Sequence, residues 1–198
     1  MNVDAPKDFD AAISWYEKIL KTKKTADILY NIGILIVSIL SVYKPISGNC
    51  YFMKEGYEQA IEFYHQSLEL DGTRAECYYN LGNALVSIQN SDKAIEPFKK
   101  SCELDPTNIA AFYNLGNAYL LAKDVQNAQK AFEEIIRIEP NNYEWRYRIA
   151  QALADCGEID LALTFAEGAL KLKADDNETL FLKGSSNLYV ESLLIQYA

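Results

Sequence analysis

The sequence has 198 residues, of which 49% are hydrophobic and 24% are charged. This composition is typical of a globular chain rather than a disordered one. The formal net charge of −9 disfavours nucleic acid and anionic membrane surfaces as partners.

The first predicted element covers residues 8–22, DFDAAISWYEKILKT, and aligns with residues 56–70, GYEQAIEFYHQSLEL. In this alignment Ala12 corresponds to Ala60 and Trp15 to Phe63. Residues 8–25 are therefore expected to form half of a helical repeat, its second helix. Such a start indicates either a fragment or an array without an N-terminal cap. The opening MNVDAPKDFD is acidic and polar, which is not the pattern of a signal peptide.

The next predicted unit, residues 26–74, starts with a helix over residues 26–39, where Asn31 and Gly33 take the places of Asn80 and Gly82. Its second helix is delayed by 15 extra residues, near 40–54. We expect a loop at Leu40–Lys54, either alone or after an extended first helix. The apolar run 28–43 is shorter than the roughly 20 residues that span a membrane, so it is interpreted as a repeat helix.

Residues 75–108 and 109–142 form two successive segments of 34 residues that repeat each other in register. Self-similarity at this period is typical of stacked repeats rather than of a closed domain. The identical pairs are Tyr79/Tyr113, Asn80/Asn114, Leu81/Leu115, Gly82/Gly116, Asn83/Asn117, Ala94/Ala128, Phe98/Phe132, Pro106/Pro140 and Asn108/Asn142.

These residues resemble the tetratricopeptide repeat (TPR), a unit of two helices, here named helix A and helix B. The resemblance implies an all-α fold, a right-handed superhelix (solenoid) of stacked hairpins. Small residues let two helices approach closely, so Gly82, Gly116 and Ala94 should be buried where helix A crosses helix B. Pro106 should end helix B, and Pro97 should kink it.

The last predicted units are a repeat at 143–176 and a terminal helix at 177–198. In the former, Arg146, Ala166 and Ala174 depart from the aromatic, aromatic and proline positions of the pattern. The terminal segment is too apolar to be a clean cap, which predicts a homo-oligomer through this helix, a truncated parent protein, or a tail folded back on its own repeat.

A set of tyrosines and polar side chains recurs on helix A, which by the resemblance lines the concave groove of the superhelix. Amides can bond the backbone of an extended peptide, and tyrosines add rigid contact area. The same residues would also suit mere packing between repeats. The predicted groove residues, which would bind a partner peptide or helix, are Tyr79, Asn80, Asn83, Tyr113, Asn114, Asn117, Tyr147, Arg148 and Gln151.

Some TPR proteins grip a C-terminal carboxylate with lysines, asparagines and an arginine. Asn83, Asn114 and Arg148 match three of those places, but Tyr79 and Glu144 replace the two lysines. Two lost cations and one added acid should weaken the capture of an anion, so this clamp is not expected.

No nucleophile–base pair, acid pair or phosphate loop can be recognised, so no catalytic residue and no cofactor is predicted. Four cysteines without a C-x2-C pair, together with a single histidine, argue against a zinc site and indicate a reduced cytoplasmic chain. The sequence therefore predicts a protein-interaction scaffold. The alternatives are a substrate-recruiting segment of a larger enzyme, such as a glycosyltransferase, and a self-associating structural protein.

Overall fold

The structure is a computed structural model that describes residues 18, 19, 21, 25–43, 50–173, 179, 183 and 184. Every secondary-structure element in these residues is an α-helix, as the repeat pattern predicts. The chain divides into two compact units, Met1–Ala111 (unit 1) and Phe112–Ala198 (unit 2), and each is described by itself.

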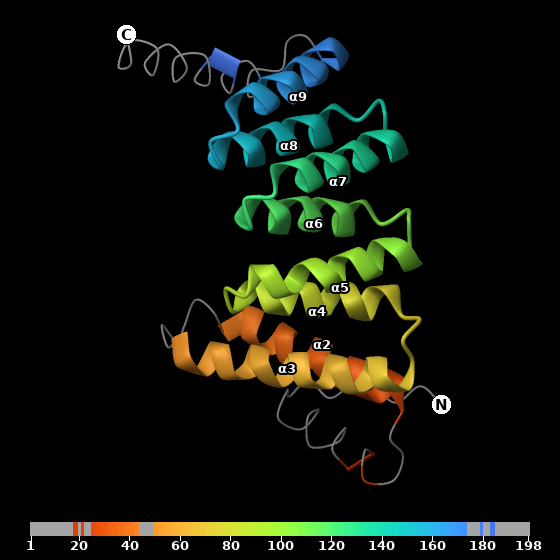
Figure 1. Ribbon diagram of the computed structural model, residues 1–198. Coiled ribbons are helices and arrows are strands. Elements are labelled where there is room, and N and C mark those ends of the chain that lie inside the picture. Colours follow the sequence, from red (N-terminus) through yellow and green to blue (C-terminus); the bar gives the residue numbers. More distant parts are fainter. Residues whose placement is uncertain are drawn as a thin grey trace. The chain divides into compact units, whose positions relative to one another are not determined.

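Unit 1 contains two helical hairpins. The first pairs α2 (Ala26–Tyr43) with α3 (Cys50–Leu70), and the second pairs α4 (Ala75–Ser87) with α5 (Ser91–Leu104). Helix α4 also packs against α3 and touches α2 (Figure 1). Because a single hairpin cannot bury its apolar face, the contact between α3 and α4 completes the core of the unit.

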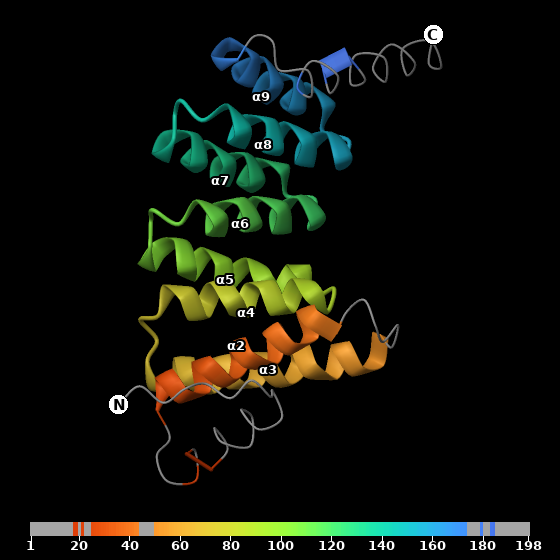
Figure 2. The same cartoon turned by 180° about the vertical axis from the view of Figure 1, so that it is seen from behind.

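Unit 2 continues the alternation of helices A and B. Helix α6 (Ile109–Leu121) crosses the division between the units and is followed by α7 (Val125–Ile138). The last described hairpin pairs α8 (Tyr143–Asp155) with α9 (Ile159–Leu172). Helix α8 packs against both α7 and α9 (Figure 2).

A glycine of helix A lies directly against an aromatic ring of helix B in three hairpins. Gly33 faces Tyr64, Gly82 faces Phe98 and Gly116 faces Phe132. A Cβ atom at any of these glycines would lie within 3.0 Å of the ring carbons, well inside normal carbon–carbon contact. Gly82, Gly116 and Ala94 are buried, as predicted. The close packing offsets the roughly 1 kcal/mol that glycine costs in a helix.

The α8–α9 hairpin replaces both partners of this contact. Ala150 stands at the glycine position and Ala166 at the ring position, and both are buried. The neighbouring Phe165 supplies an aromatic ring instead, which packs edge-on against Phe132 at a centroid distance of 6.5 Å. Because the aromatic ring is at position 165 rather than 166, the methyl group of Ala150 fits on helix A.

Arg146 is the second departure that the sequence shows in this repeat. It stands where α4 has Tyr78, and its Nη2 donates to the carbonyl of Pro140 at 3.0 Å. Its side chain passes over Gly168, where an added Cβ would lie 3.1 Å from Nη1. A side chain at this position of α9 would require the end of the arginine to shift.

The three described turns from helix A to helix B, those that follow α4, α6 and α8, share one conformation. Gln89, Lys123 and Gly157 occupy the same repeat position and have φ values of 63°, 59° and 86°. This left-handed region costs a residue with a Cβ about 1–2 kcal/mol, a penalty that glycine avoids. The tight turn brings each helix B back antiparallel to its helix A.

Of the two alternatives for Leu40–Lys54, the extended first helix is confirmed, and the predicted loop is wrong at its C-terminal end. Helix α2 continues through Tyr43 and α3 already begins at Cys50. These helices have 18 and 21 residues, against 13 and 14 in α4 and α5. Most of the extra residues therefore lengthen the two helices. The helix breakers Pro45 and Gly48 fall in residues 44–49, outside the described residues.

The predictions for the two ends of the chain fall largely outside the described residues. Lys18, Ile19 and Lys21 are helical, but the rest of the predicted half repeat up to residue 24 is not described. In the predicted terminal helix, Thr179, Lys183 and Gly184 are helical, and the apolar tail from residue 185 is not described.

Replacing Gly116 with alanine should destabilise the protein. The new methyl group would displace the Phe132 ring, and we expect a loss of about 1–3 kcal/mol of unfolding free energy. Chemical denaturation measures this loss. Gly72→Ala is the control, because an added Cβ there meets its nearest atom at an ordinary 3.5 Å. Equal stabilities of the two variants would contradict the close crossing.

Ser67 and Ser101 occupy the same repeat position, are both fully buried, and should respond oppositely to alanine. The Ser67 hydroxyl donates to the carbonyl of Ala26 at 2.8 Å. Among the described residues, the Ser101 hydroxyl has no hydrogen-bond partner. Ser67→Ala should cost about 0.5–1.5 kcal/mol, whereas Ser101→Ala should be neutral or stabilising. Thermal melts of the two variants test this difference, and equal losses would refute it.

Candidate functional site: the A-helix faces

The predicted groove residues fall on one face of each helix A. On α4, Tyr79, Asn80 and Asn83 span about 100° of the helix circumference, since successive residues turn by about 100°. The corresponding residues of α6 and α8 share that register. Arg148 and Gln151 are exposed and the other seven are half-buried. Their union into one concave groove stays a prediction.

The tyrosine of this face has a packing role in three hairpins. Tyr30, Tyr79 and Tyr113 lie against the rings of Tyr64, Phe98 and Phe132, with centroid distances of 6.1, 6.2 and 6.1 Å. Aromatic pairs at this distance and tilt attract each other. The helix B ring that covers the glycine therefore also fixes the tyrosine, and Tyr79 and Tyr113 keep a partly exposed surface.

A polar network joins α2 to α4 in unit 1. Asn80 donates to the Tyr30 hydroxyl at 3.0 Å, and that hydroxyl donates to Glu76 at 3.2 Å. The guanidinium of Arg74 lies 4.6 Å from the Tyr30 ring centroid and pairs with Asp27. Burial, and then the nearby Glu76 carboxylate, raise the pKa of Tyr30 to about 12. Tyr30 is buried, and the amide of Asn80 is engaged within the protein.

Unit 2 brings an aromatic pair and a cation together between α6 and α8. The rings of Tyr113 and Trp145 lie 5.5 Å apart, and the guanidinium of Arg148 lies 5.5 Å from the Trp145 ring. The Tyr113 hydroxyl also donates to the backbone carbonyl of Arg148, with a long distance of 3.5 Å. All three side chains are at least partly exposed. This cluster is a preformed apolar surface with a positive edge.

Trp145 is the residue of this cluster that the repeat pattern did not identify. The same repeat position holds Cys77 in α4 and Ala111 in α6, and both are fully buried. A tryptophan is too large for that space, so part of its ring stays exposed and lies against Tyr113. The sequence signal that could have identified Trp145 is a large ring at a position where the two preceding repeats hold small residues.

The surroundings of Arg148 do not favour an anion. Glu144 is exposed in the first turn of α8, one helical turn before Arg148. Its carboxylate lies on the same side of the helix, because residues four apart are neighbours on a helix surface. The guanidinium is better suited to a neutral carbonyl or to an aromatic ring of a ligand than to a carboxylate.

Three cysteines, Cys77, Cys102 and Cys156, are free thiols. Cys77 and Cys102 are buried and Cys156 is exposed. The thiol of Cys77 donates to the Tyr64 carbonyl at 3.6 Å. Burial raises the pKa of the Cys77 thiol to about 11 and that of Cys102 to about 12, so both stay protonated and unreactive at neutral pH.

The described residues offer neither a membrane-spanning helix nor a metal centre. None of their helices combines the length and apolar character that crossing a membrane requires. Within the same part of the chain, no three histidine, cysteine, aspartate or glutamate side chains gather into a group that could hold a metal ion.

Two family models match the chain. The model described as TPR repeat matches residues 48–89 and 82–122, and the model described as Tetratricopeptide repeat matches residues 119–180. These matches cover α3 to α9. The chain belongs to the tetratricopeptide repeat family.

Solved structures with the same fold include MamA and YrrB. A crystal structure of MamA is 28% identical in sequence, with a TM-score of 0.65, over 84% of this chain and 90% of that one. MamA from Desulfovibrio magneticus RS-1 is 15% identical, with a TM-score of 0.66, over 86% and 89%. YrrB, described as a TPR protein with an unusual peptide-binding site, is 22% identical, with a TM-score of 0.57, over 89% and 84%. A search of curated proteins found no match. The fold is thus the all-α TPR solenoid.

The buried thiols should make stability fall at alkaline pH. Above pH 9.0, the ordinary thiol pKa, cysteines of the unfolded chain lose protons, while Cys77 holds its proton to about pH 11. A raised pKa in the folded state therefore gives stability below pH 9 that is lost as pH rises towards 11. Cys77→Ala, which copies Ala111, should flatten the decline of Tm across this window. Identical slopes for variant and parent would contradict the pKa shift.

Proposed function

We propose that this protein is a non-catalytic interaction scaffold that holds an extended peptide segment of a partner protein against the A-helix face of unit 2. The observation that carries the proposal is the cluster of Tyr113, Trp145 and Arg148, which is partly exposed and fixed by packing. Tryptophan, tyrosine and arginine are the side chains that most often dominate binding energy at protein interfaces.

Each group of this face has a distinct role in the proposed complex. The rings of Tyr113 and Trp145 accept an apolar side chain of the peptide. Gln151 and Asn117 offer amides to its backbone, so the contact depends little on peptide sequence. Arg148 contacts a carbonyl or an aromatic ring, in keeping with the nearby Glu144. Because the rings are already packed, little conformational entropy is lost on binding.

Two further observations support this role. YrrB, which shares the fold, is itself described as having a peptide-binding site. The three described free thiols fit the reducing conditions of the cytoplasm, where we place the scaffold. In unit 1, the amide of Asn80 joins α4 to α2. Asn80 therefore stabilises the hairpins of unit 1 and is not part of the proposed peptide contact.

The test selects peptides from a random library on the full chain and measures their affinity by fluorescence polarisation. Trp145→Ala should weaken binding by about 2 kcal/mol or more, roughly thirtyfold, as for a central interface residue. Arg148→Ala and Gln151→Ala should weaken it less. In a Trp15→Phe background, Trp145 is the remaining tryptophan of the two, and its emission should shift when peptide binds.

Gln129→Ala is the matched control, because Gln129 lies on the helix B α7 and bonds only to Glu133 at its surface. It should leave affinity unchanged. Selected peptides that bind Trp145→Ala and wild type equally well, without a change in emission, would overturn the proposal. Circular dichroism of each variant confirms that helicity is intact.

A further inference from the structure

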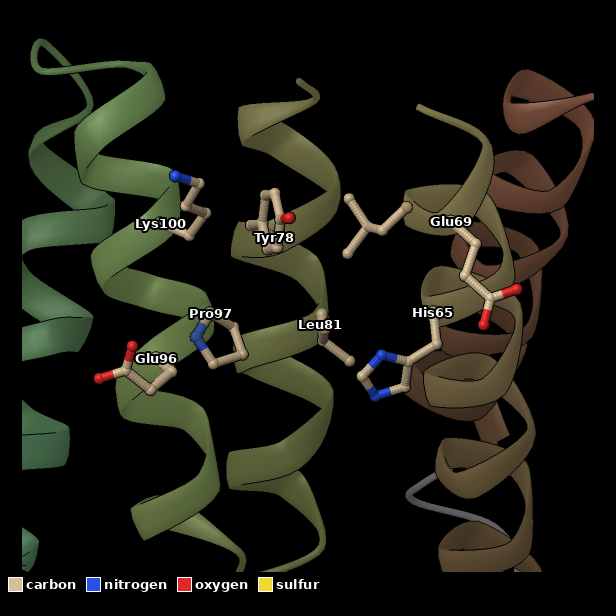
Figure 3. A pocket seen from close by; sticks show the side chains of 8 residues that line it. His65, Glu69, Tyr78, Leu81, Glu96, Pro97 and Lys100 are labelled. Atoms are coloured by element: carbon tan, nitrogen blue, oxygen red, sulfur yellow. The ribbon is translucent and has the colours of Figure 1, made fainter. Parts of the chain in front are cut away.

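Unit 1 has a depression of about 600 Å³ between α3 and α5, with α4 at its base (Figure 3). Tyr78 and Leu81 form the base, His65 projects from α3, and Pro97 forms part of the α5 wall. Leu68 of α3 also lines the depression. The size is that of a site for a small ligand or a few side chains. The lining also includes Glu69, Glu96 and Lys100, so charged side chains border the apolar part.

The depression lies on the opposite side of α4 from the groove residues. At about 100° per residue, Tyr78 and Leu81 leave the helix on one side, while Asn80 and Asn83 leave it roughly 180° away. A ligand here would therefore not compete for the A-helix face. The site is formed instead between successive B helices.

Pro97 is a residue that helix stability alone would not favour. It lies in the interior of α5, which continues on both sides from Ser91 to Leu104. A proline there lacks a backbone donor and costs about 3 kcal/mol relative to alanine. Departures from local preference of this kind are expected at functional sites. Its short ring also leaves the depression open.

The equivalent place in unit 2 has a different lining. Phe165 replaces Pro97 and turns towards Phe132, where Ala166 leaves room. Arg146 replaces Tyr78 and extends over Gly168. In unit 1 the room beneath is already filled by Phe98, which is fully buried. A phenylalanine at position 97 would therefore project into the depression, which provides a blocking variant.

The two walls of the depression differ in charge. On α3, Glu58, Glu62, His65 and Glu69 are all exposed and follow one another at spacings of four, three and four residues, which places them in one stripe. On α5, the exposed charges neutralise each other, since Lys99 pairs with Glu96 at 2.8 Å and Lys100 with Glu103 at 2.9 Å. The rim beside the apolar base therefore carries a net negative charge on the α3 side.

We propose that this depression is a second docking site, which takes a basic amphipathic helix of a partner protein. A leucine or phenylalanine of that helix enters between Leu68, Leu81 and Pro97. Lysine or arginine side chains on its flank face the α3 stripe. Helices commonly bind in this way, with an apolar face in a groove and charges at the rim. The protein would thus bind two partners, one in this depression of unit 1 and one on the A-helix face of unit 2.

The test uses a fluorescein-labelled synthetic peptide of lysine, alanine and leucine with one central phenylalanine, about 15 residues long and patterned as an amphipathic helix. A scrambled peptide of the same composition has the same charge without the apolar face. Fluorescence polarisation with the full chain should show the amphipathic peptide binding at least about tenfold tighter than the scrambled one, the discrimination expected when an apolar anchor is buried.

Variants locate the site. Pro97→Phe should weaken the amphipathic peptide about tenfold by filling the depression, and Leu68→Ala should weaken it severalfold by removing a wall. Glu62→Gln/Glu69→Gln should weaken it more than Glu133→Gln/Asp160→Asn, a control that removes two exposed charges from unit 2. Trp145→Ala should have no effect, which separates this site from the A-helix face. Circular dichroism and thermal melts check the fold of each variant.

Two results would overturn the proposal. Equal binding of the amphipathic and scrambled peptides would show that only the net charge attracts them. An affinity that Leu68→Ala and the Glu62→Gln/Glu69→Gln pair leave unchanged would place the peptide elsewhere, even if Pro97→Phe failed to fold.

Discussion

The distance between the two helices of a hairpin is set by one contact, that of a helix A glycine with a helix B ring. At Gly33, Gly82 and Gly116 the opposing ring occupies the volume of a Cβ atom. In the α8–α9 hairpin, Ala150 replaces the glycine of helix A and Ala166 replaces the ring of helix B. A methyl group on helix A and a ring on helix B therefore do not meet at the same crossing. Protein interiors are packed densely enough that such volumes must balance locally. The rest of each hairpin is arranged around this balance.

The ring that meets the glycine also determines what helix A presents to solvent. In three hairpins this ring packs against the tyrosine beside the glycine, and in two of them the tyrosine also contacts the next hairpin within its unit. Tyr30 accepts a bond from Asn80, and Tyr113 lies against Trp145. The polar and aromatic face is therefore positioned by the core, so that side chains with a packing role also make up the proposed binding surface.

Much of the fold could be derived from the sequence, because the two 34-residue segments align without gaps and place the glycine, alanine and ring positions unambiguously. The secondary structure of the extra residues near 40–54 could not be derived in the same way. An alignment counts added residues, but helix extension and loop formation differ by small local preferences, and here α2 and α3 simply continue. Trp145 was not predicted because the other repeats hold small residues, Cys77 and Ala111, at its position. The depression beside Pro97 depends on which volumes remain unfilled, and a pattern of residue types does not contain that information.

Arg146 and Gly168 show a limit on the modularity of the array. Repeats of this kind invite the view that any unit can be exchanged, duplicated or recombined with another, because each has the same backbone. Yet the guanidinium of Arg146 passes over the one position of α9 that has no side chain, and the same positions hold Tyr78 and Lys100 in unit 1. A recombination that joined α8 to α5 would place Arg146 against the aliphatic part of the Lys100 side chain. The intact hairpin is therefore the unit that can be exchanged without disturbing this contact.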